Sequence, residues 1–390
     1  MRSLHYTFTI LLMSITLLGS CNSANSANNE ERLSINTSTP PPDDPSDGKQ
    51  IEMVFCLDAT GSMSGLIGTA KEKIWAIVSE VAQGTDVASL ELGMVFYRDR
   101  SDIFTTKPIP LTNDLDSVYS ELLAINAAGG GDTPESVNQA LNEAVTQMTW
   151  SESKDVYKTI FVVGDCPPHM DYQDDVSYLE SCKVAAKKGI TINTIKLGNG
   201  CLEAIPHFKK MAECSNGEFL QLDQDANDIV IATPFDNEIN EVSKKIDESR
   251  MYYGSASEQS YNYTKKANSV GIYSEGSVTS NSDRSTYKNS EAGQKAWMGN
   301  KEMITDYSEN NVELEKIPEK ELPEELKDKT LAEKKAILDK LKAEREANKS
   351  KLAELSKKRQ EFINAEKKAR GEESSFSKEV VEIMNKQADR

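Results

Sequence analysis

The chain has 390 residues, of which 38% are hydrophobic and 28% charged, and its formal net charge at pH 7 is −18 with a sequence pI of about 4.8. Phosphate backbones repel such an acidic chain, so nucleic acid is excluded as the expected partner. The length favours two or three structural units over one large core, and the high charge indicates that part of the chain is not globular.

The N-terminus has the features of a targeting segment. Arg2 precedes an apolar run over residues 8–18 that is short for a membrane span and typical of a signal-peptide core. The run ends in Leu18-Gly19-Ser20-Cys21, and small residues before a cysteine resemble the cleavage site of bacterial lipoproteins. The resemblance implies a signal peptide over residues 1–20, a lipid anchor on Cys21 and a place in the bacterial cell envelope, facing the periplasm or exposed at the surface.

Changes of composition divide the rest of the chain. Residues 21–49 are rich in Asn, Ser, Thr and Pro, which predicts a disordered tether. Residues 50–248 alternate strand and helix signals and form the expected folded domain. Residues 249–322 are dominated by Ser, Asn, Tyr, Gly and Lys without a lasting apolar period, which predicts a low-complexity polar linker with little fixed structure. Residues 323–390 are rich in Lys, Glu, Leu and Ala, which predicts a charged helical tail.

The folded domain shows regular alternation. The expected strands are 51–57, 90–97, 103–109, 158–164, 190–197 and 218–222. The expected helices are 66–82, 115–125, 135–148, 176–188, 202–213 and 227–249. Alternating units with nearly continuous apolar strands predict a doubly wound, Rossmann-like α/β sheet, mostly parallel, with 103–109 as an antiparallel edge strand. Such sheets bind ligands at the carboxyl ends of their strands.

The tail carries an imperfect coiled-coil pattern. Its larger apolar residues fall on two heptad rows, at Leu331, Leu338, Leu341, Leu352, Leu355 and Phe362. Arg345, Asn348 and Arg359 interrupt those rows, so a long stable coiled coil is not assured. We therefore expect a charged helix that faces solvent, and the alternative is a helical hairpin or a module for self-association.

Export also changes the interpretation of the five cysteines that follow Cys21. Cys56 lies in an expected core strand, where a small buried hydrophobic residue is the simplest interpretation. Cys201 and Cys214 flank a short predicted helix and are the pair that we expect to form a disulfide. Cys and His residues do not cluster at ligand spacing in the sequence, so a zinc site is not expected.

The most informative segment follows the first predicted strand. Asp58, Thr60 and Ser62 stand at positions i, i+2 and i+4 in a tight turn before the helix at 66–82. Alternate residues of an extended loop point the same way, so one carboxylate and two hydroxyls can converge. Converging hard oxygens are the ligands that a small divalent cation such as Mg²⁺ prefers.

Two further segments strengthen this interpretation. The glycine-rich run at 129–131 permits a backbone path closed to other residues, and Pro134 and Glu135 after it suit the first turn of a helix. The apolar strand at 158–164 ends on Asp165. We therefore expect Asp165 to project at the same edge of the sheet as the first loop.

In this order and at these strand ends, the three loops resemble the metal-ion-dependent adhesion site of the von Willebrand factor A domain family, over roughly residues 50–248. The resemblance implies that Asp58, Thr60 and Ser62 form the first loop of the site and that Asp165 supplies the acidic residue of the third. It further implies Mg²⁺ (or Mn²⁺), held directly by the two hydroxyls and directly or through water by the two carboxylates.

The second loop departs from the commonest family pattern, which supplies a threonine. Aligned through the following helix, Glu135 falls on the ligand position, and the run is also similar to the integrin β-subunit version, in which a glutamate coordinates. We rank Glu135 first, Thr133 second and Asp132 third. Tyr97, Arg98, Asp99 and His169 would line the rim, where they either contact a partner or are ordinary turn and loop residues without a special role.

The family resemblance implies coordination rather than catalysis, so we do not expect an enzyme. The leading hypothesis is a membrane-anchored adhesion or scaffolding module that binds a protein partner whose Asp or Glu carboxylate completes the metal. A structural protein that assembles through its C-terminal helices is the alternative. A metal-dependent phosphohydrolase is less favoured, because Thr60 stands where the haloacid-dehalogenase type needs a second Asp. A hydrolase elbow is also absent from the sequence, because Met63 stands where it needs a serine.

Overall fold

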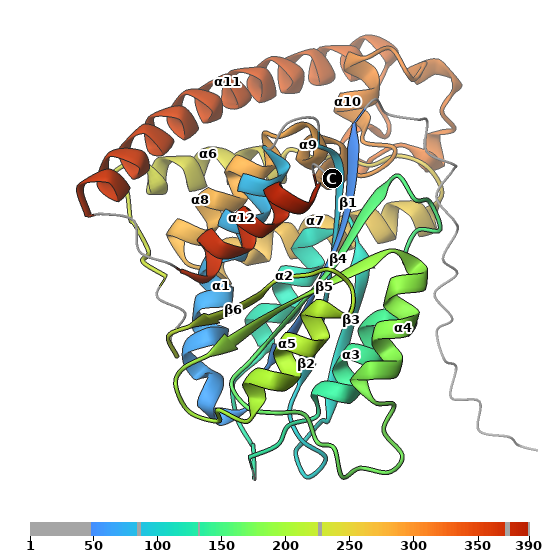
Figure 1. Ribbon diagram of the computed structural model, residues 1–390. Coiled ribbons are helices and arrows are strands. Elements are labelled where there is room, and N and C mark those ends of the chain that lie inside the picture. The colour runs from blue at the N-terminus through green and yellow to red at the C-terminus, as the bar shows by residue number, and fades with distance from the viewer. Residues whose placement is uncertain (1–47, 84–86, 132, 225–227, 371–374, 389–390) are drawn as a thin grey trace, which may run out of the picture. The chain divides into compact units, whose positions relative to one another are not determined.

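The computed structural model describes residues 48–83, 87–131, 133–224, 228–370 and 375–388. Its centre is a six-stranded sheet in the order β3-β2-β1-β4-β5-β6 (Figure 1). The strands are β1 (Lys49–Asp58), β2 (Val87–Tyr97), β3 (Thr106–Thr112), β4 (Val156–Gly164), β5 (Ile190–Leu197) and β6 (Phe219–Leu222). All neighbours are parallel except β2 and β3. The predicted mostly parallel α/β sheet is confirmed, with its antiparallel edge strand at 106–112 instead of 103–109.

The predicted signal peptide, Cys21 and nearly all of the predicted tether lie outside the described residues. Within the described ranges, no helix combines the length and the apolar character that crossing a membrane requires.

Helices cover both faces of the sheet. One face carries α1 (Ser64–Ala82) and α2 (Leu115–Ala124), and the other carries α3 (Val137–Thr146), α4 (Tyr178–Lys188) and α5 (Ala204–Glu213). Successive residues of β1 alternate between two cores, since Phe55 and Leu57 join the first while Val54 and Cys56 join the second. A strand buried on both faces is apolar throughout, which explains the continuous run that predicted it. Cys56 is buried and unpaired among the described cysteines, as expected.

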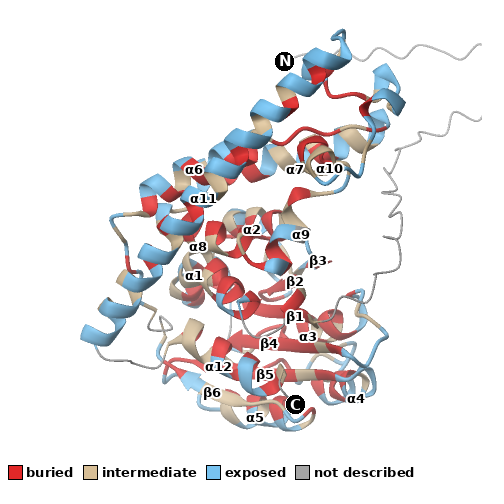
Figure 2. Cartoon of the chain, turned by 90° about the horizontal axis from the view of Figure 1, so that it is seen from above, coloured by how far each residue is buried: buried red, intermediate tan, exposed pale blue. Residues whose placement is uncertain are grey.

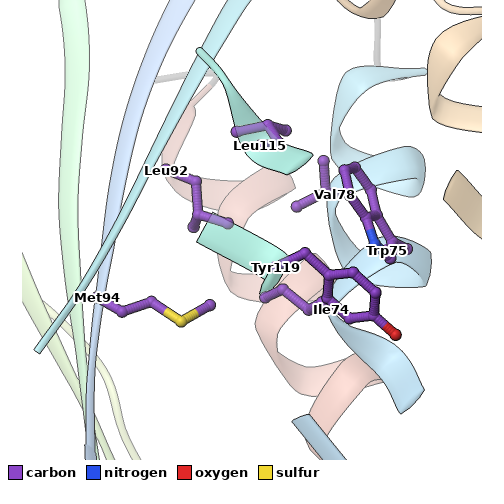
Figure 3. Close-up of a pocket in the computed structure, with 7 residues that line it drawn as sticks. All are labelled: Ile74, Trp75, Val78, Leu92, Met94, Leu115 and Tyr119. Carbon is purple, nitrogen blue, oxygen red and sulfur yellow. The ribbon is translucent and has the colours of Figure 1, made fainter. Parts of the chain in front are cut away.

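The core on the α1 side encloses a small apolar pocket (Figure 3). Side chains from α1, α2 and β2 line it, namely Ile74, Trp75, Val78, Leu92, Met94, Leu115 and Tyr119. The Trp75 ring meets the Tyr119 ring edge-on with centroids 5.6 Å apart, and the Tyr287 ring lies at the same centroid distance from Trp75. Because Tyr287 belongs to a later helix, this cluster joins the sheet to the part of the chain after residue 249.

Residues 249–322 contain helices, which corrects the predicted linker. They are α7 (Ala256–Glu275), α8 (Val278–Lys288), α9 (Glu291–Met298) and α10 (Met303–Ser308), and three short 3-10 turns follow at 314–316, 319–321 and 324–326. Ser255 and Ser277 cap the first two helices. α8 packs along α1, where the buried Ser280 hydroxyl donates to the Lys71 carbonyl (3.2 Å). Because such buried faces are polar, they leave no apolar period in the sequence.

A buried ionic network ties these helices to the sheet domain. Arg284 of α8 binds Asp116 of α2 through two hydrogen bonds of 2.6 and 2.5 Å. Arg284 also lies 3.4 Å from Asp247 of α6 (Asp236–Glu248), and Lys288 contacts the same carboxylate at 2.6 Å. Burial alone would raise the pKa of Asp116, but the Arg284 guanidinium lowers it below its usual range. The network therefore stabilises the contact between the two halves of the chain only while its charges remain paired.

The predicted charged tail is helical. α11 (Leu331–Arg370) runs along α6, with much of its surface exposed (Figures 1 and 2). On its buried side, Leu338 clusters with Met251 and Met303, while Leu352 and Leu355 pack against α6. Most of the two apolar rows is thus covered by this same chain.

The two arginines that interrupt the rows hold α11 in place. Arg345 forms a bidentate ion pair with Glu302, with distances of 2.7 and 3.0 Å. Arg359 pairs with Asp236 at 2.7 Å and with Asp283 at 2.6 Å. The polar positions that weaken the coiled-coil pattern are therefore the points where α11 is anchored to the helices beneath it.

α12 (Phe376–Ala388) packs beside α1 on the same face of the sheet. The Phe376 ring lies 6.1 Å from the Phe55 ring, and the Gln387 side chain exchanges two hydrogen bonds with Asn193 of β5 (3.0 and 2.8 Å). A helix that follows the whole α6–α11 segment thus covers the sheet. The core of the sheet domain therefore extends past the boundary predicted at residue 248.

Phe376→Ala should lower the free energy of unfolding by about 3–5 kcal/mol, because it removes a buried aromatic side chain from the core. Denaturant unfolding followed by circular dichroism measures the change. Asn385→Ala, on the exposed side of the same helix, is the matched control and should stay within about 0.5 kcal/mol of wild type. Equal effects of the two substitutions would contradict the described packing of α12.

Asp116→Asn should destabilise the protein by about 3–5 kcal/mol at pH 7, because Arg284 loses its charged partner in a buried site. The folded-state pKa of Asp116 is depressed, so its stabilisation is complete above the ordinary value near 3.8 and is lost as the pH falls below that value. Unfolding curves of wild type and variant should therefore stay equally far apart from pH 7 to about 4 and converge in more acidic buffer.

Asp174→Asn removes an exposed partner of Arg100 and is the control for the ionic network. It should leave the unfolding curve almost unchanged. A gap between wild type and Asp116→Asn that persists undiminished well below pH 4 would show that the Asp116 charge is not its source.

Candidate metal centre

The first predicted loop forms a compact set of oxygens at the end of β1. Asp58 is fully buried, and its Oδ1 accepts hydrogen bonds from the backbone N–H of Thr60 (2.9 Å) and from its hydroxyl (2.7 Å). The hydroxyls of Thr60 and Ser62 are 3.1 Å apart, and Ser62 is the exposed member of the set. A short 3-10 turn at Gly61–Met63 then leads into α1. The structure brings these three residues together as predicted.

The glycine-rich segment lies directly against this loop. Gly129 and Gly130 have φ angles of +80° and +81°, which favour glycine, and the Gly129 carbonyl accepts a hydrogen bond from the N–H of Gly61 (3.1 Å). A Cβ at Gly130 would lie 3.2 Å from Cβ of Thr60 and 3.5 Å from Oε1 of Glu135. The missing side chain therefore lets the first two loops approach each other.

Among the described second-loop candidates, Glu135 is the buried one. Its side chain is buried, whereas Thr133 is exposed and Asp132 lies outside the described residues. The Glu135 backbone pairs with the segment after β4, through its N–H to Pro167 O (2.9 Å) and its carbonyl to the N–H of His169 (3.0 Å). The second and third loops are thus fixed to each other.

The third loop places Asp165 at the end of β4. Its carboxylate is mostly buried, and Oδ2 accepts a hydrogen bond from Gln224 (3.3 Å). A Cβ at the preceding Gly164 would lie 3.2 Å from Oδ2 of Asp58 and would collide with the Tyr97 hydroxyl. Gln224 is a contact that sequence reasoning missed. The sequence feature that could have identified Gln224 is its position two residues after β6, at the same edge of the sheet as Asp165.

Three buried carboxylate oxygens at this edge accept no hydrogen bond from any described residue: Oδ2 of Asp58, Oε2 of Glu135 and Oδ1 of Asp165. Burial, opposed by the Thr60 hydrogen bonds and helped by Asp165, raises the pKa of Asp58 to about 7. Burial, and then the charge of Asp58, raises the pKa of Glu135 to about 9. A divalent cation bound beside these carboxyl groups would favour their ionised forms and would lower both pKa values.

The donor set suits a hard cation when its hydroxyls are included. Within the described ranges, His, Cys, Asp and Glu side chains do not gather in groups of three or more placed to hold an ion by themselves. A cation at this edge would therefore also depend on the Thr60 and Ser62 hydroxyls and on water. Carboxylate, hydroxyl and water oxygens are what Mg²⁺ accepts.

The residues predicted to line the rim are buried, which corrects their expected role. Arg98 donates to the carbonyls of Ala59 (3.0 Å) and Asn126 (2.5 Å), so it fixes the first loop to the segment before the glycine-rich run. Tyr97 donates to the Val163 carbonyl (3.0 Å). These contacts hold the loops in place, and a partner could not reach either side chain.

Asp99 and His169 brace the loops in the same way. Asp99 accepts hydrogen bonds from the hydroxyls of Ser136 (3.1 Å) and Tyr172 (3.0 Å). The buried His169 ring lies between Asp99 (3.3 Å) and Asp171 (2.8 Å). The loops at this edge also carry large exposed apolar side chains that the sequence analysis did not single out, at Ile103, Met170 and Leu202.

The predicted disulfide is wrong. The structure pairs Cys166 with Cys201 and Cys182 with Cys214. Cys201 and Cys214 flank the ten-residue helix α5, whose ends are about 15 Å apart. A disulfide needs Cα atoms within about 7 Å, so each cysteine pairs across to the neighbouring β4–α4 segment instead.

Comparison with known proteins supports the family resemblance. The family model of the von Willebrand factor A domain matches residues 52–224. An ariadne-like RING finger protein of Acanthamoeba polyphaga mimivirus is 29% identical over 122 residues, which are 30% of this chain and 11% of that protein. The von Willebrand factor A domain-containing protein 7 of Rattus norvegicus is 37% identical over 91 residues, which are 23% of this chain and 10% of that protein. The chain spans about a tenth of the length of these relatives.

Solved structures show a similar segment. One is proximal thread matrix protein 1 from the mussel byssus, solved with a zinc-occupied MIDAS motif. It is 14% identical, the matched segment covers 47% of this chain and 44% of that protein, and the TM-score is 0.35. An aerotolerance-related membrane protein from Bacteroides fragilis is 18% identical, and the TM-score is 0.33. The matched segment covers 45% of this chain and 92% of that protein. Together, the family match, the sheet order and the three loops at its carboxyl edge show that residues 52–224 of this chain form a von Willebrand factor A domain.

Proposed function

We propose that the protein is a binding module that depends on a divalent cation, Mg²⁺ (or Mn²⁺), and that recognises a protein partner without catalysing a reaction. The observation that carries the proposal is the set of three buried carboxylate oxygens without a described hydrogen-bond partner. Buried charge of this kind is costly unless it is paired or coordinates a metal. The proposed ligands are Asp58, Thr60, Ser62, Glu135 and Asp165.

The chain's own residues prepare this site. Thr60 holds Asp58 by two hydrogen bonds, which leaves Oδ2 as the oxygen available for an ion. Ser62 is exposed and forms the entrance, while Gly130 and Gly164 keep side chains out of the space between the loops. A bound cation would supply a coordination position for an Asp or Glu carboxylate of the partner.

We further propose that the protein is held at a membrane of the bacterial cell envelope by a lipid on Cys21. The short apolar run and the small residues before Cys21 support this location. The two disulfides support it as well, because disulfides persist mainly in exported proteins.

Mg²⁺ should raise the thermal unfolding temperature of the wild-type chain by a few degrees above its value in EDTA. A ligand at about 100 times its Kd stabilises the folded state by roughly 2.7 kcal/mol. Asp58→Asn should abolish the shift. The substitution keeps the side-chain oxygen that accepts the two hydrogen bonds from Thr60, but it removes a charge that the neighbouring carboxylates repel. The unfolding temperature of Asp58→Asn in EDTA should therefore equal or exceed that of wild type. If Mg²⁺ raised the unfolding temperature of Asp58→Asn as much as that of wild type, the result would contradict the proposed site.

The choice of second-loop ligand can be tested by a pair of substitutions. Glu135→Gln preserves the shape of the side chain but removes its charge, and it should weaken Mn²⁺ binding by more than about tenfold, a loss typical even of residues behind the ligands. Thr133→Ala, at the exposed second candidate, should leave the affinity unchanged. Calorimetric titration with Mn²⁺ measures both, and the reverse order of effects would assign the ligand to Thr133.

A further inference from the structure

One disulfide lies beside the candidate metal centre and the other does not. Asp165 directly precedes Cys166, whose bridge to Cys201 reaches the loop between β5 and α5. The bridge between Cys182 and Cys214 instead joins α4 to the end of α5. The two bridges therefore differ in their distance along the chain from the proposed ligands, although both connect the same pair of βα segments.

The loop that receives the Cys166 bridge is firmly attached to the sheet. Lys196 of β5 is fully buried, and its ammonium donates to the carbonyls of Gly198 (2.8 Å) and Gly200. The N–H of Gly198 donates to the Leu222 carbonyl of β6 (2.8 Å). Cys201 thus provides a fixed point to which the segment after Asp165 is covalently tied.

Among the described contacts, one hydrogen bond holds the Asp165 carboxylate. Gln224 donates to Oδ2 of Asp165 at 3.3 Å, which is long for a hydrogen bond, and Oδ1 has no described partner. The carboxylate is thus weakly restrained, and the bridge at the next residue in the chain is the stronger attachment.

We propose that the disulfide between Cys166 and Cys201 is a positioning element of the metal centre, which holds Asp165 at the sheet edge before a cation binds. The inference rests on the proposed cation binding. A preorganised ligand costs less to bring into place, so the intact bridge gives the higher cation affinity.

The same bridge makes cation binding sensitive to thiols. When an external dithiol reduces it, two electrons and two protons pass to the protein and the S–S bond breaks. Cys166 and Cys201 become thiols, and the dithiol closes to its own disulfide. Asp165 is then held by β4 and Gln224 without the covalent tie to the β5–α5 loop.

The test compares the Mn²⁺ affinity of three versions of the 390-residue chain by calorimetric titration. They are wild type, the double variant Cys166→Ser/Cys201→Ser and the matched control Cys182→Ser/Cys214→Ser. The first variant should bind Mn²⁺ about tenfold more weakly than wild type or worse, as when a group that orients a metal ligand is lost. The control should bind with wild-type affinity.

Thermal unfolding separates positioning from general stabilisation. The two bridges span similar separations of 35 and 32 residues, so both variants should lose similar stability. A structural role alone would lower the unfolding temperature of both variants without a difference in affinity between them. Equal affinities in all three chains, or equal losses in both variants, would overturn the proposal.

A reduction experiment covers the case in which Cys166→Ser/Cys201→Ser does not fold. The control variant retains the bridge of interest as its one described disulfide, and it is titrated with Mn²⁺ before and after dithiothreitol. The same tenfold loss is expected, and an unchanged affinity after complete reduction rejects the inference. Wild type that binds no Mn²⁺ rejects the proposed function and the inference together, whereas wild-type binding with unaffected variants rejects the inference alone.

Discussion

The burial of three neighbouring carboxyl groups is the constraint that the surrounding structure must satisfy. Asp58, Glu135 and Asp165 meet at one edge of the sheet, each with an oxygen that lacks a described hydrogen-bond partner. Parallel strands bring their carboxyl ends to this edge, and glycines at 130 and 164 allow the loops to come close. The arrangement costs folding free energy, which the well-packed cores on both faces of the sheet offset.

The treatment of charge differs sharply between this edge and the helices after residue 249. Where these helices pack, Asp116 of α2 is paired with Arg284 of α8, and Glu302 is paired with Arg345 of α11. The buried charges therefore make short, bidentate contacts. Paired charges of that kind specify how helices pack. Carboxyl groups buried together without such partners, with pKa values raised by burial, are typical of functional sites. The contrast within one chain distinguishes scaffold from site.

The parts of the site that follow from local spacing were predictable from the sequence, and the parts that depend on distant contacts were not. Asp58 and its hydroxyl neighbours lie within five residues, and Asp165 follows from the end of an apolar strand. Cys201 was assigned the wrong partner, because its pairing depends on which loop lies across the sheet edge. The rim role given to Arg98 failed for the same reason. The helices between residues 249 and 322 were missed because serine packing leaves no apolar period.

The placement of α12 also determines when this protein can fold. Phe55 lies near the start of the described chain and Phe376 near its end, yet their rings share one core. The face of the sheet that α12 covers therefore stays open during synthesis until the residues after 375 have been made, and contacts between such distant positions form slowly. A nascent or truncated chain would expose that apolar face to chaperones and proteases. In the proposed export of this chain, the same delay would keep it unfolded until it has crossed the membrane.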